Sequence, residues 1–314
     1  MKIGVVGAGY WGSKVASEYN NMLSDGKISE LLIFDESAEC KSMKRKEGYK
    51  TAESLNELFA KVDSIHICTP NETHFLLASK AIDVGANALI EKPLTKSYRE
   101  AQKIAERSVE SGLIFQVGHI FRFSDTVQQL RGIIRDQHLL NDITHINLVW
   151  GHQRVEGSST TQESILWDLL PHPLDIIHYL TDEWPLEVSG RFMKSRMGKK
   201  EEEGILLYKL PDGIVVSVFL SGTLQTKTRK IQIWHPDKVI EADILLSKIS
   251  VTSGKSTEVM SVKEGNTLRA ELTNFMDAVN TGKNTKNSII IGANAVALIQ
   301  RSEEVLKNAQ GTRI

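Results

Sequence analysis

The stretch Lys2-Ile3-Gly4-Val5-Val6-Gly7-Ala8-Gly9-Tyr10-Trp11-Gly12 decides the fold of this chain. Its opening residues form a short apolar run that predicts a buried strand, and an apolar pattern of helical spacing follows over 15–23. Between the two lies G-x-G-x-x-G, which in this context is typical of a dinucleotide-binding turn. Gly7 would make the tight turn, Gly9 would let the backbone approach a pyrophosphate, and Gly12 would allow close packing of the helix on the strand. The alternative, a glycine-rich turn without a ligand, fits less well with a strand that begins at residue 2.

A carboxylate follows the second predicted strand, 31–34. Asp35 lies 23 residues after Gly12, slightly beyond the spacing typical of the dinucleotide fingerprint. A carboxylate here would accept hydrogen bonds from the adenosine ribose hydroxyls and would repel a 2′-phosphate, which favours NAD over NADP. The basic run 41–46 could compensate for that repulsion, but a solvated helix face is the preferred interpretation.

Strands over 64–68, 88–90 and 113–118 alternate with helices over 73–84 and 97–111, which predicts a doubly wound parallel sheet. Ligands of such sheets gather at the carboxyl ends of the strands. The turn 69–74, with Asn71 as helix N-cap, and the segment Glu91-Lys92-Pro93 are therefore expected beside the cofactor. The residues expected to bind NAD are Gly7, Gly9, Tyr10, Trp11, Gly12, Asp35, Thr69, Pro70, Asn71, His74, Glu91 and Lys92.

The pattern changes after residue 120. A helix over 124–136 is followed by strand-like runs that include 143–150, 186–193, 205–210, 214–220 and 230–234, so a mostly antiparallel sheet is expected. We predict an α/β dinucleotide-binding domain over 1–120 and an α+β domain with an open sheet over 121–292. The final helix, 293–308, could pack back on the first domain. The run 214–220 offers apolar residues to both faces of its sheet, which predicts a homodimer or homotetramer formed through this domain.

The stretch 165–175 carries a second chemical signal. Asp168, His172 and Asp175 are spaced by four and three residues, and two prolines around the histidine favour a helix that begins there. A carboxylate beside a histidine fixes its tautomer and raises its basicity, as a general acid/base requires. Taken alone, the stretch fits better with a core histidine of purely structural role. The other motifs of the chain favour the catalytic interpretation.

Composition excludes several partners. The chain has 314 residues and a formal net charge of -1, which gives no electrostatic reason to expect nucleic acid or an anionic membrane. No apolar stretch approaches the length of a membrane span. Cys40 and Cys68 lie outside any metal-ligand spacing, so we expect free thiols in a reducing cytoplasm and no metal site.

Four motifs in order resemble the Gfo/Idh/MocA family over essentially the whole chain: the glycine turn, Thr69-Pro70-Asn71-x-x-His74, Glu91-Lys92-Pro93 and Asp168-x-x-x-His172-x-x-Asp175. The resemblance implies a Rossmann domain, a second domain on an open antiparallel sheet, a nicotinamide dinucleotide, and hydride transfer at a sugar or cyclitol carbon. By this resemblance, Lys92 would be the catalytic lysine, His172 the general acid/base and Asp168 its partner acid. Asp175 matches a second acid whose role varies among family members. Two departures are that 162–167 replace a glycine-rich approach and that a proline directly follows the histidine.

The Trp-Asp-Leu-x-Pro-His form looks like family members associated with nucleotide-sugar and polysaccharide biosynthesis. We therefore expect a nucleotide-linked sugar, such as a UDP-N-acetylhexosamine or its uronate oxidised at C3, with a free sugar or inositol as the close alternative. The planar guanidinium groups of Arg122 and Arg154 suit the oxygens of a diphosphate. The loop 156–162 could close over a long substrate. A non-catalytic dinucleotide-binding regulator, or a reductase of an unrelated substrate such as biliverdin, fits poorly with the retained lysine, acid and histidine. The residues expected to contact substrate are Lys92, His119, Arg122, Arg154, Asp168 and His172.

Overall fold

The computed structural model describes residues 1–154, 164–194, 201–283 and 285–309, and the chain divides into two compact units. The first unit contains Met1–Ile120 and Leu268–Val296. The second contains Phe121–Thr267 and the chain from Ala297 onward.

The first unit is built on a parallel sheet of five strands in the order β2-β1-β3-β4-β5. The strands are buried along almost their whole length, as expected for parallel strands that are covered by helices on both faces. The chain leaves β1 toward β2 on one side and then crosses to β3 on the other. The carboxyl ends of β1 and β3 therefore flank a topological switch point, where ligands of such sheets bind. The strands are β1 (Lys2–Val6), β2 (Glu30–Phe34), β3 (Ser64–Ile67), β4 (Asn87–Ile90) and β5 (Phe115–Val117).

Local sequence explains the helices that connect these strands. The side chains of Ser37 and Ser54 accept hydrogen bonds from the first turns of α2 and α3, as good N-caps do. Gly112 ends α5 in the left-handed conformation, with φ of 67°. The predicted doubly wound sheet is confirmed. The helices and turn are α1 (Tyr10–Ser24), α2 (Ala38–Lys46), α3 (Leu55–Lys61), η1 (Asn71–Thr73), α4 (His74–Asp83) and α5 (Tyr98–Ser111).

Two later helices also contribute to the first unit. On α9 (Thr267–Thr281), Leu272, Phe275 and Met276 enter the core cluster built around β1 and α1, so this helix lies with the first unit and not in the second domain, where the sequence placed it. The helix α10 (Ile289–Ala309) begins in the first unit, and its later part lies in the second, where Ser302 and Tyr208 share a hydrogen bond of 2.8 Å. These groupings depend on contacts between segments far apart in sequence, which local patterns do not reveal.

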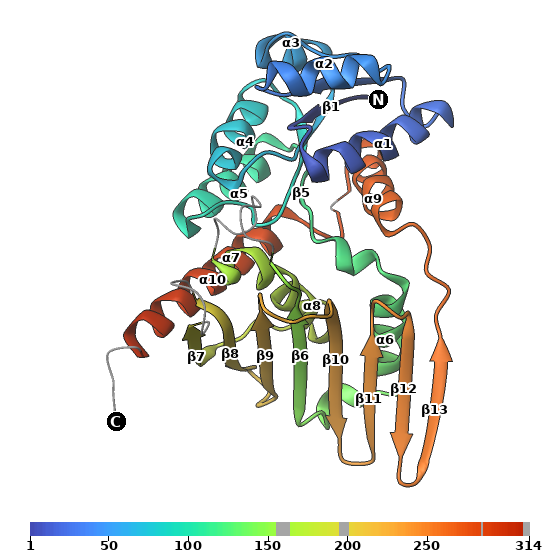
Figure 1. Ribbon diagram of the computed structural model, residues 1–314, viewed down its shortest axis with the longest axis vertical. Coiled ribbons are helices and arrows are strands. Elements are labelled where there is room, and N and C mark those ends of the chain that lie inside the picture. The colour runs from blue at the N-terminus through green and yellow to red at the C-terminus, as the bar shows by residue number, and fades with distance from the viewer. Residues whose placement is uncertain (155–163, 195–200, 284, 310–314) are drawn as a thin grey trace. The chain divides into compact units, whose positions relative to one another are not determined.

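The second unit is built on a sheet of eight strands in the order β13-β12-β11-β10-β6-β9-β8-β7 (Figure 1). The pair β6–β9 is parallel, and every other neighbouring pair of described strands is antiparallel. Of the helices of this unit, α6 (Asp125–Asp136) and α7 (Ile165–Leu169) pack on the sheet, and α8 (Pro171–Thr181) packs on both of these helices. The predicted open antiparallel sheet is confirmed. The elements are η2 (Ile120–Phe123), α6 (Asp125–Asp136), η3 (Leu139–Asn141), β6 (His145–Gly151), α7 (Ile165–Leu169), α8 (Pro171–Thr181), β7 (Glu187–Lys194), β8 (Glu201–Lys209), β9 (Val215–Ser221), β10 (Thr228–His235), β11 (Lys238–Asp243), β12 (Lys248–Ser253) and β13 (Ser256–Ser261).

The side chains of the large sheet alternate between its two faces. Leu148, Trp150, Val218 and Ile231 are fully buried on the face that the helices cover, and most of their neighbours along each strand are half-buried or exposed on the other face. In the described part of the chain, every helix is too short or too polar to cross a membrane.

Candidate active site

The glycine turn of the first unit fits a dinucleotide. Gly7 has φ of 90°, and a Cβ atom on Gly12 would lie 2.0 Å from the Gly7 carbonyl oxygen, so both positions require glycine. Gly9 is the N-cap of α1, and no described atom lies within 4 Å of the position that its Cβ would take. The helix therefore presents its unpaired N–H groups and the positive end of its dipole across open space, as a pyrophosphate site requires.

Asp35 is fixed at the carboxyl end of β2. Its Oδ2 accepts a hydrogen bond of 2.7 Å from the Ala8 N–H, and its Oδ1 accepts one of 2.9 Å from the Ser37 N–H. In the neighbouring basic run, Lys44 pairs with a glutamate of its own segment at 2.7 Å, and Arg45 pairs with Glu53. These two cations are therefore engaged elsewhere, whereas the ammonium of Lys41 lies 5.4 Å from the ring centroid of Phe34, the last residue of β2.

The turn after β3 differs from the prediction in one detail. Asn71 begins the short turn η1, while Thr73 is the N-cap of α4, so the prediction that Asn71 caps this helix is wrong. The Thr73 hydroxyl donates to Thr69 Oγ1 at 2.6 Å, with the Pro70 carbonyl oxygen at 2.8 Å. The turn is thus fixed by its own hydroxyl groups.

His74 connects this turn to the Glu-Lys-Pro segment. The imidazole is fully buried, with Nδ1 3.0 Å from the Pro93 carbonyl oxygen and Nε2 3.0 Å from that of Thr69. Burial lowers the pKa of His74, while the hydrogen bonds to these carbonyl oxygens oppose that shift. We therefore interpret His74 as a residue that positions the turn, in place of the direct cofactor contact expected from sequence.

Glu91 lies between the start of α1 and the middle of β3. Its Oε1 accepts a hydrogen bond of 2.6 Å from Trp11 Nε1 and lies 3.1 Å from His66 Nε2. Burial by itself would raise the pKa of Glu91, but the hydrogen bond and charge of His66, the Trp11 indole and the charge of Lys92 lower it overall. The structure thus ties Trp11 to the residue that precedes Lys92. The sequence pattern gave no sign of this link, because His66 looks like an ordinary strand residue.

The acid-histidine motif occupies two helices of the second unit that follow each other directly. As predicted, a helix begins at Pro171, whereas Asp168 lies in the preceding helix α7. Leu170 has helical backbone angles and continues the hydrogen-bonded turns on both sides. Asp168 and His172 therefore keep the four-residue spacing of neighbours on one helix face.

Aromatic rings surround His172. Its ring centroid lies 5.0 Å from that of Phe121 and 5.9 Å from that of Trp150, and the Phe121 and Trp150 rings meet edge to face at 4.8 Å. The guanidinium of Arg229 lies 4.7 Å from the Trp150 ring centroid. An imidazole and a cation are thus brought to the same buried tryptophan.

Cations gather around Asp168. Arg154 Nε lies 4.0 Å from Asp168 Oδ2. Arg229 is 5% exposed and donates to the carbonyl oxygens of Gly151 at 2.8 Å and Thr228 at 2.7 Å, and its Nη2 lies 3.4 Å from His152 Nδ1. Burial lowers the pKa of Arg229 to about 10, opposed by the charge of Asp168. Arg154 thus lies beside the Asp168 carboxylate and Arg229 interacts with it through its charge, and two cations near one carboxylate suit an anionic ligand.

His152 belongs to the same group. Burial and the charge of Arg229 lower the pKa of His152, partly offset by Asp168. Sequence reasoning missed both Arg229 and His152. Arg229 lies 61 residues beyond Asp168, inside an ordinary strand pattern, so no local signal could have found it.

Arg122 and His119 do not fit the substrate contacts predicted for them. Arg122 Nε donates to Asp175 Oδ1 at 2.6 Å, and the two side chains are 6% and 1% exposed. Its guanidinium also lies 5.2 Å from the Tyr179 ring. His119 is buried, and its carbonyl oxygen accepts a hydrogen bond from Asn287. The structure therefore gives Asp175 a partner in Arg122, and we carry neither Arg122 nor His119 into the proposed substrate site. The loop 156–162 lies outside the described residues.

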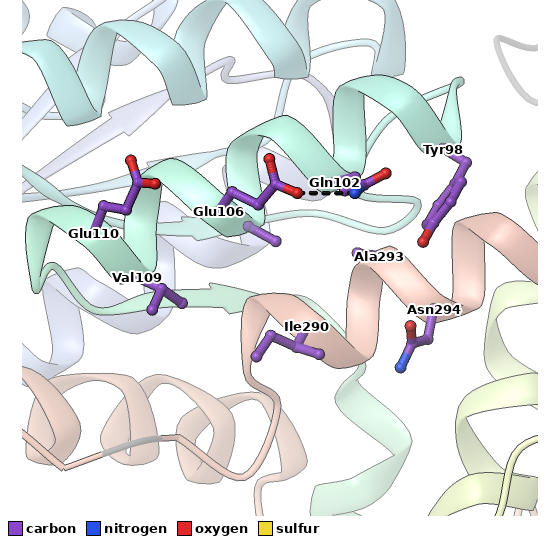
Figure 2. Close-up of a pocket in the computed structure, with 9 residues that line it drawn as sticks. Tyr98, Gln102, Glu106, Val109, Glu110, Ile290, Ala293 and Asn294 are labelled. Carbon is purple, nitrogen blue, oxygen red and sulfur yellow. Dashed lines mark hydrogen bonds between the residues drawn. The ribbon is translucent and has the colours of Figure 1, made fainter.

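A pocket of about 380 Å³ lies between α5 and the beginning of α10 (Figure 2). The lining contains neither a histidine nor a cation, and Gln102 donates its amide to Glu106 at 2.8 Å. These side chains do not form a catalytic group. The lining residues are Tyr98, Gln102, Ala105, Glu106, Val109, Glu110, Ile290, Ala293 and Asn294.

Comparison with known proteins identifies the family. Residues 1–119 match the model of the oxidoreductase family with an NAD-binding Rossmann fold, and residues 127–238 match the GFO/IDH/MocA C-terminal domain. The chain belongs to the GFO/IDH/MocA oxidoreductase family. It is thus an enzyme of the dehydrogenase type with a site for NAD, as its motifs predict.

Members of this family with known activities resemble the chain over most of its length. UDP-N-acetylglucosamine 3-dehydrogenase of Acidithiobacillus ferrooxidans is 27% identical over 293 residues, which are 89% of this chain and 88% of the relative. Inositol 2-dehydrogenase of Corynebacterium glutamicum strain ATCC 13032 is 25% identical over 72% of this chain and 68% of its own. The solved structure of the Acidithiobacillus enzyme matches the fold with a TM-score of 0.88 at 23% identity, over 98% of each chain.

Proposed function

We propose that this oxidoreductase transfers a hydride from a hydroxyl carbon of a nucleotide-linked sugar to NAD, as a UDP-N-acetylhexosamine 3-dehydrogenase does. The observation that carries the proposal is the group formed by Asp168, Arg154, Arg229 and His152 near His172. It combines an acid-histidine pair for proton transfer with a surplus of cations for an anionic substrate. The similarity to the Acidithiobacillus enzyme over most of both chains supports the same class of substrate.

Proton transfer falls to the acid-histidine pair. In the direction of oxidation, His172 accepts the proton of the reacting hydroxyl, and Asp168 orients the imidazole and stabilises its charged form. Lys92 follows Glu91, which Trp11 and His66 hold in place, and its ammonium stabilises the alkoxide as charge develops. When bound, the nicotinamide supplies the hydride acceptor.

The same proposal assigns the cofactor contacts. Gly7, Gly9 and Gly12 shape the turn that receives the pyrophosphate, and the N-terminus of α1 supplies its N–H groups. Asp35 accepts hydrogen bonds from the adenosine ribose hydroxyls, which favours NAD over NADP. Tyr10, Thr69, Pro70 and Asn71 are the further cofactor contacts proposed from the family motif.

Arg154 and Arg229 recognise the diphosphate of the substrate. The planar guanidinium fork suits phosphate oxygens, and a buried cation strengthens that attraction because water screens it less. A free sugar or inositol lacks such a charge, so a preference for one of these would leave both arginines without a ligand. The similarity to inositol 2-dehydrogenase keeps that alternative open to the same experiment.

The experiment is steady-state kinetics of Arg154→Ala and Arg229→Lys variants. For a UDP-linked sugar we expect KM to rise about tenfold or more, since a hydrogen bond to a charged group contributes about 1.5–3 kcal/mol, while kcat changes less. Arg131→Ala is the matched control, because Arg131 lies in the same unit and pairs with Asp182. Unchanged KM in both site variants would contradict the diphosphate contact.

We also propose a homodimer or homotetramer formed through the outer face of the large sheet, in the cytoplasm. Ile205 and Phe219 are register partners on β8 and β9, and Val149 of β6 pairs with Phe219 from the other side. The exposed Leu207 and Val215 lie on the same face of these strands, and exposed apolar side chains gathered on one face are typical of an interface. Both cysteines are free, in keeping with a reducing compartment.

A further inference from the structure

Three metal-ligating side chains meet beneath the glycine turn of the first unit. His66 lies on β3, Cys68 follows that strand, and Glu91 follows β4. One ligand atom from each lies within 4.8 Å of the other two. Around tetrahedral zinc, such atoms are about 3.5 Å apart, given zinc bonds of about 2.0–2.3 Å. The three side chains therefore need to close by about 1 Å, a change within reach of small side-chain rotations.

The surroundings of the three ligands favour a cation. The Tyr19 hydroxyl and His66 Nδ1 are buried and have no hydrogen-bond partner among the residues that the structure describes. Glu91 places a carboxylate beside the half-buried Cys68 thiol, and a divalent ion would offset that negative charge and stabilise the thiolate.

We propose that His66, Cys68 and Glu91 form a site for a thiophilic divalent ion such as Zn²⁺, and that the ion opposes NAD binding. Imidazole, thiolate and carboxylate are the ligands that zinc takes, and three of them leave the fourth position to water. The ligands come from two strand ends 23 residues apart in sequence, so the sequence contains no short metal-ligand motif that would indicate the site.

The opposition to NAD follows from what else these ligands touch. Glu91 Oε1 accepts the hydrogen bond of Trp11, the second residue of α1, so an ion on Glu91 takes that oxygen away from the indole. The Cys68 carbonyl oxygen lies 2.8 Å from the position of a Cβ on Gly7, and its Cβ lies 3.2 Å from that of Gly12. An ion held by Cys68 therefore disturbs both the glycine turn and the start of the helix that receives the pyrophosphate.

The two cysteines allow a matched test. Cys40 is also half-buried beside the glycine turn, with Sγ 3.3 Å from the Ala8 carbonyl oxygen, so Cys40→Ser is the control for Cys68→Ser. Metal-free wild-type protein and both variants are titrated with Co²⁺, followed by absorbance, and with Zn²⁺, followed by calorimetry. We expect the wild type and Cys40→Ser to bind one ion with a thiolate-to-cobalt charge-transfer band. We expect Cys68→Ser to lose the band and to bind Zn²⁺ at least about tenfold more weakly, since even outer-shell partners of ligands contribute ten- to a hundredfold.

NAD titrations with and without Zn²⁺ complete the test. At a Zn²⁺ concentration that fills the wild-type site but not the weakened site of Cys68→Ser, the ion should raise the NAD dissociation constant of the wild type and Cys40→Ser and leave that of Cys68→Ser unchanged. If Cys68→Ser unfolds, His66→Asn replaces it; this variant keeps the thiol but loses one of the three ligands, so it should bind Co²⁺ and Zn²⁺ at least about tenfold more weakly. The absence of a thiolate band in the wild type, or its loss in Cys40→Ser and not in Cys68→Ser, would overturn the site. An unchanged NAD dissociation constant at saturating Zn²⁺ would overturn the competition.

Discussion

Replacement of Asp35 by alanine should reduce the preference for NAD over NADP by an amount that the structure allows us to estimate. Each oxygen of this carboxylate already accepts one backbone N–H, at 2.7 and 2.9 Å, and keeps a further lone pair for a ribose hydroxyl. A hydrogen bond to a charged group contributes about 1.5–3 kcal/mol, so two of them at this half-buried position contribute about 2–4 kcal/mol after allowance for solvent. The dissociation constant for NAD should therefore rise about thirty- to thousandfold.

NADP should respond differently to the same change. It also loses a hydrogen bond, but the variant removes the repulsion between Asp35 and the 2′-phosphate, about 1–4 kcal/mol for charges about 4 Å apart at an effective dielectric constant of about 20–80. The two effects offset each other, so the affinity for NADP should change little. The ratio of the two dissociation constants should thus shrink by nearly the whole loss in NAD affinity.

Isothermal titration of both cofactors into wild type, Asp35→Ala and Asp63→Ala measures this ratio. Asp63 is the matched control, because it also accepts a backbone hydrogen bond, from Lys2 at 2.8 Å, but precedes β3 at the opposite ends of the strands. The control should bind both cofactors as the wild type does. A wild type that binds NADP as tightly as NAD, or an Asp35→Ala variant with unchanged NAD affinity, would refute the reasoning.

Three further predictions concern catalysis, stability and assembly. His172→Ala and Lys92→Ala should each lower kcat, the former about a hundred- to ten-thousandfold, and NAD affinity in calorimetry should stay intact in His172→Ala; turnover near wild type would contradict the roles. Glu264 accepts four hydrogen bonds from the first turn of α6, and these lower its pKa although burial opposes them. The contribution of the ionised Glu264 carboxylate to stability is thus present above its ordinary pKa of about 4.3 and is lost as the pH falls through its folded value. Glu264→Gln should therefore reduce the free energy of unfolding by about 1 kcal/mol near pH 7. A difference between variant and wild type in urea unfolding that persists unchanged at acidic pH would argue against this. Phe219→Asp should yield monomers in light scattering, and an unaltered mass, or a wild type that is already monomeric, would exclude the outer sheet face as the interface.

Sequence predicted the parts of the fold that local patterns encode. The strand and glycine turn at the start of the chain are encoded mainly by their own residues, because the positive φ of Gly7 and the close approach of Gly12 to the Gly7 carbonyl oxygen arise within the turn. The prolines around His172 likewise fix where a helix begins. In both places the deciding interactions span a few residues, and the predictions hold.

Long-range pairing explains what sequence could not supply. The carboxylate of Asp175 attracts Arg122 from 53 residues away, which turns an expected substrate ligand into a buried ion pair. Arg229 reaches Trp150 and His152 only because β10 pairs with β6. A pattern search shows that an arginine is present, but strand pairing decides what the arginine meets.

The most direct test of the proposed activity compares kcat/KM for NADH formation from UDP-N-acetylglucosamine, its uronate, free N-acetylglucosamine and myo-inositol under the same conditions. If the cations around Asp168 bind a diphosphate, one of the UDP-linked sugars should exceed both free compounds by at least about tenfold, as expected from one hydrogen bond to a charged group. Free N-acetylglucosamine or myo-inositol reacting as well as the UDP-linked sugars would contradict the assignment of a nucleotide-linked substrate.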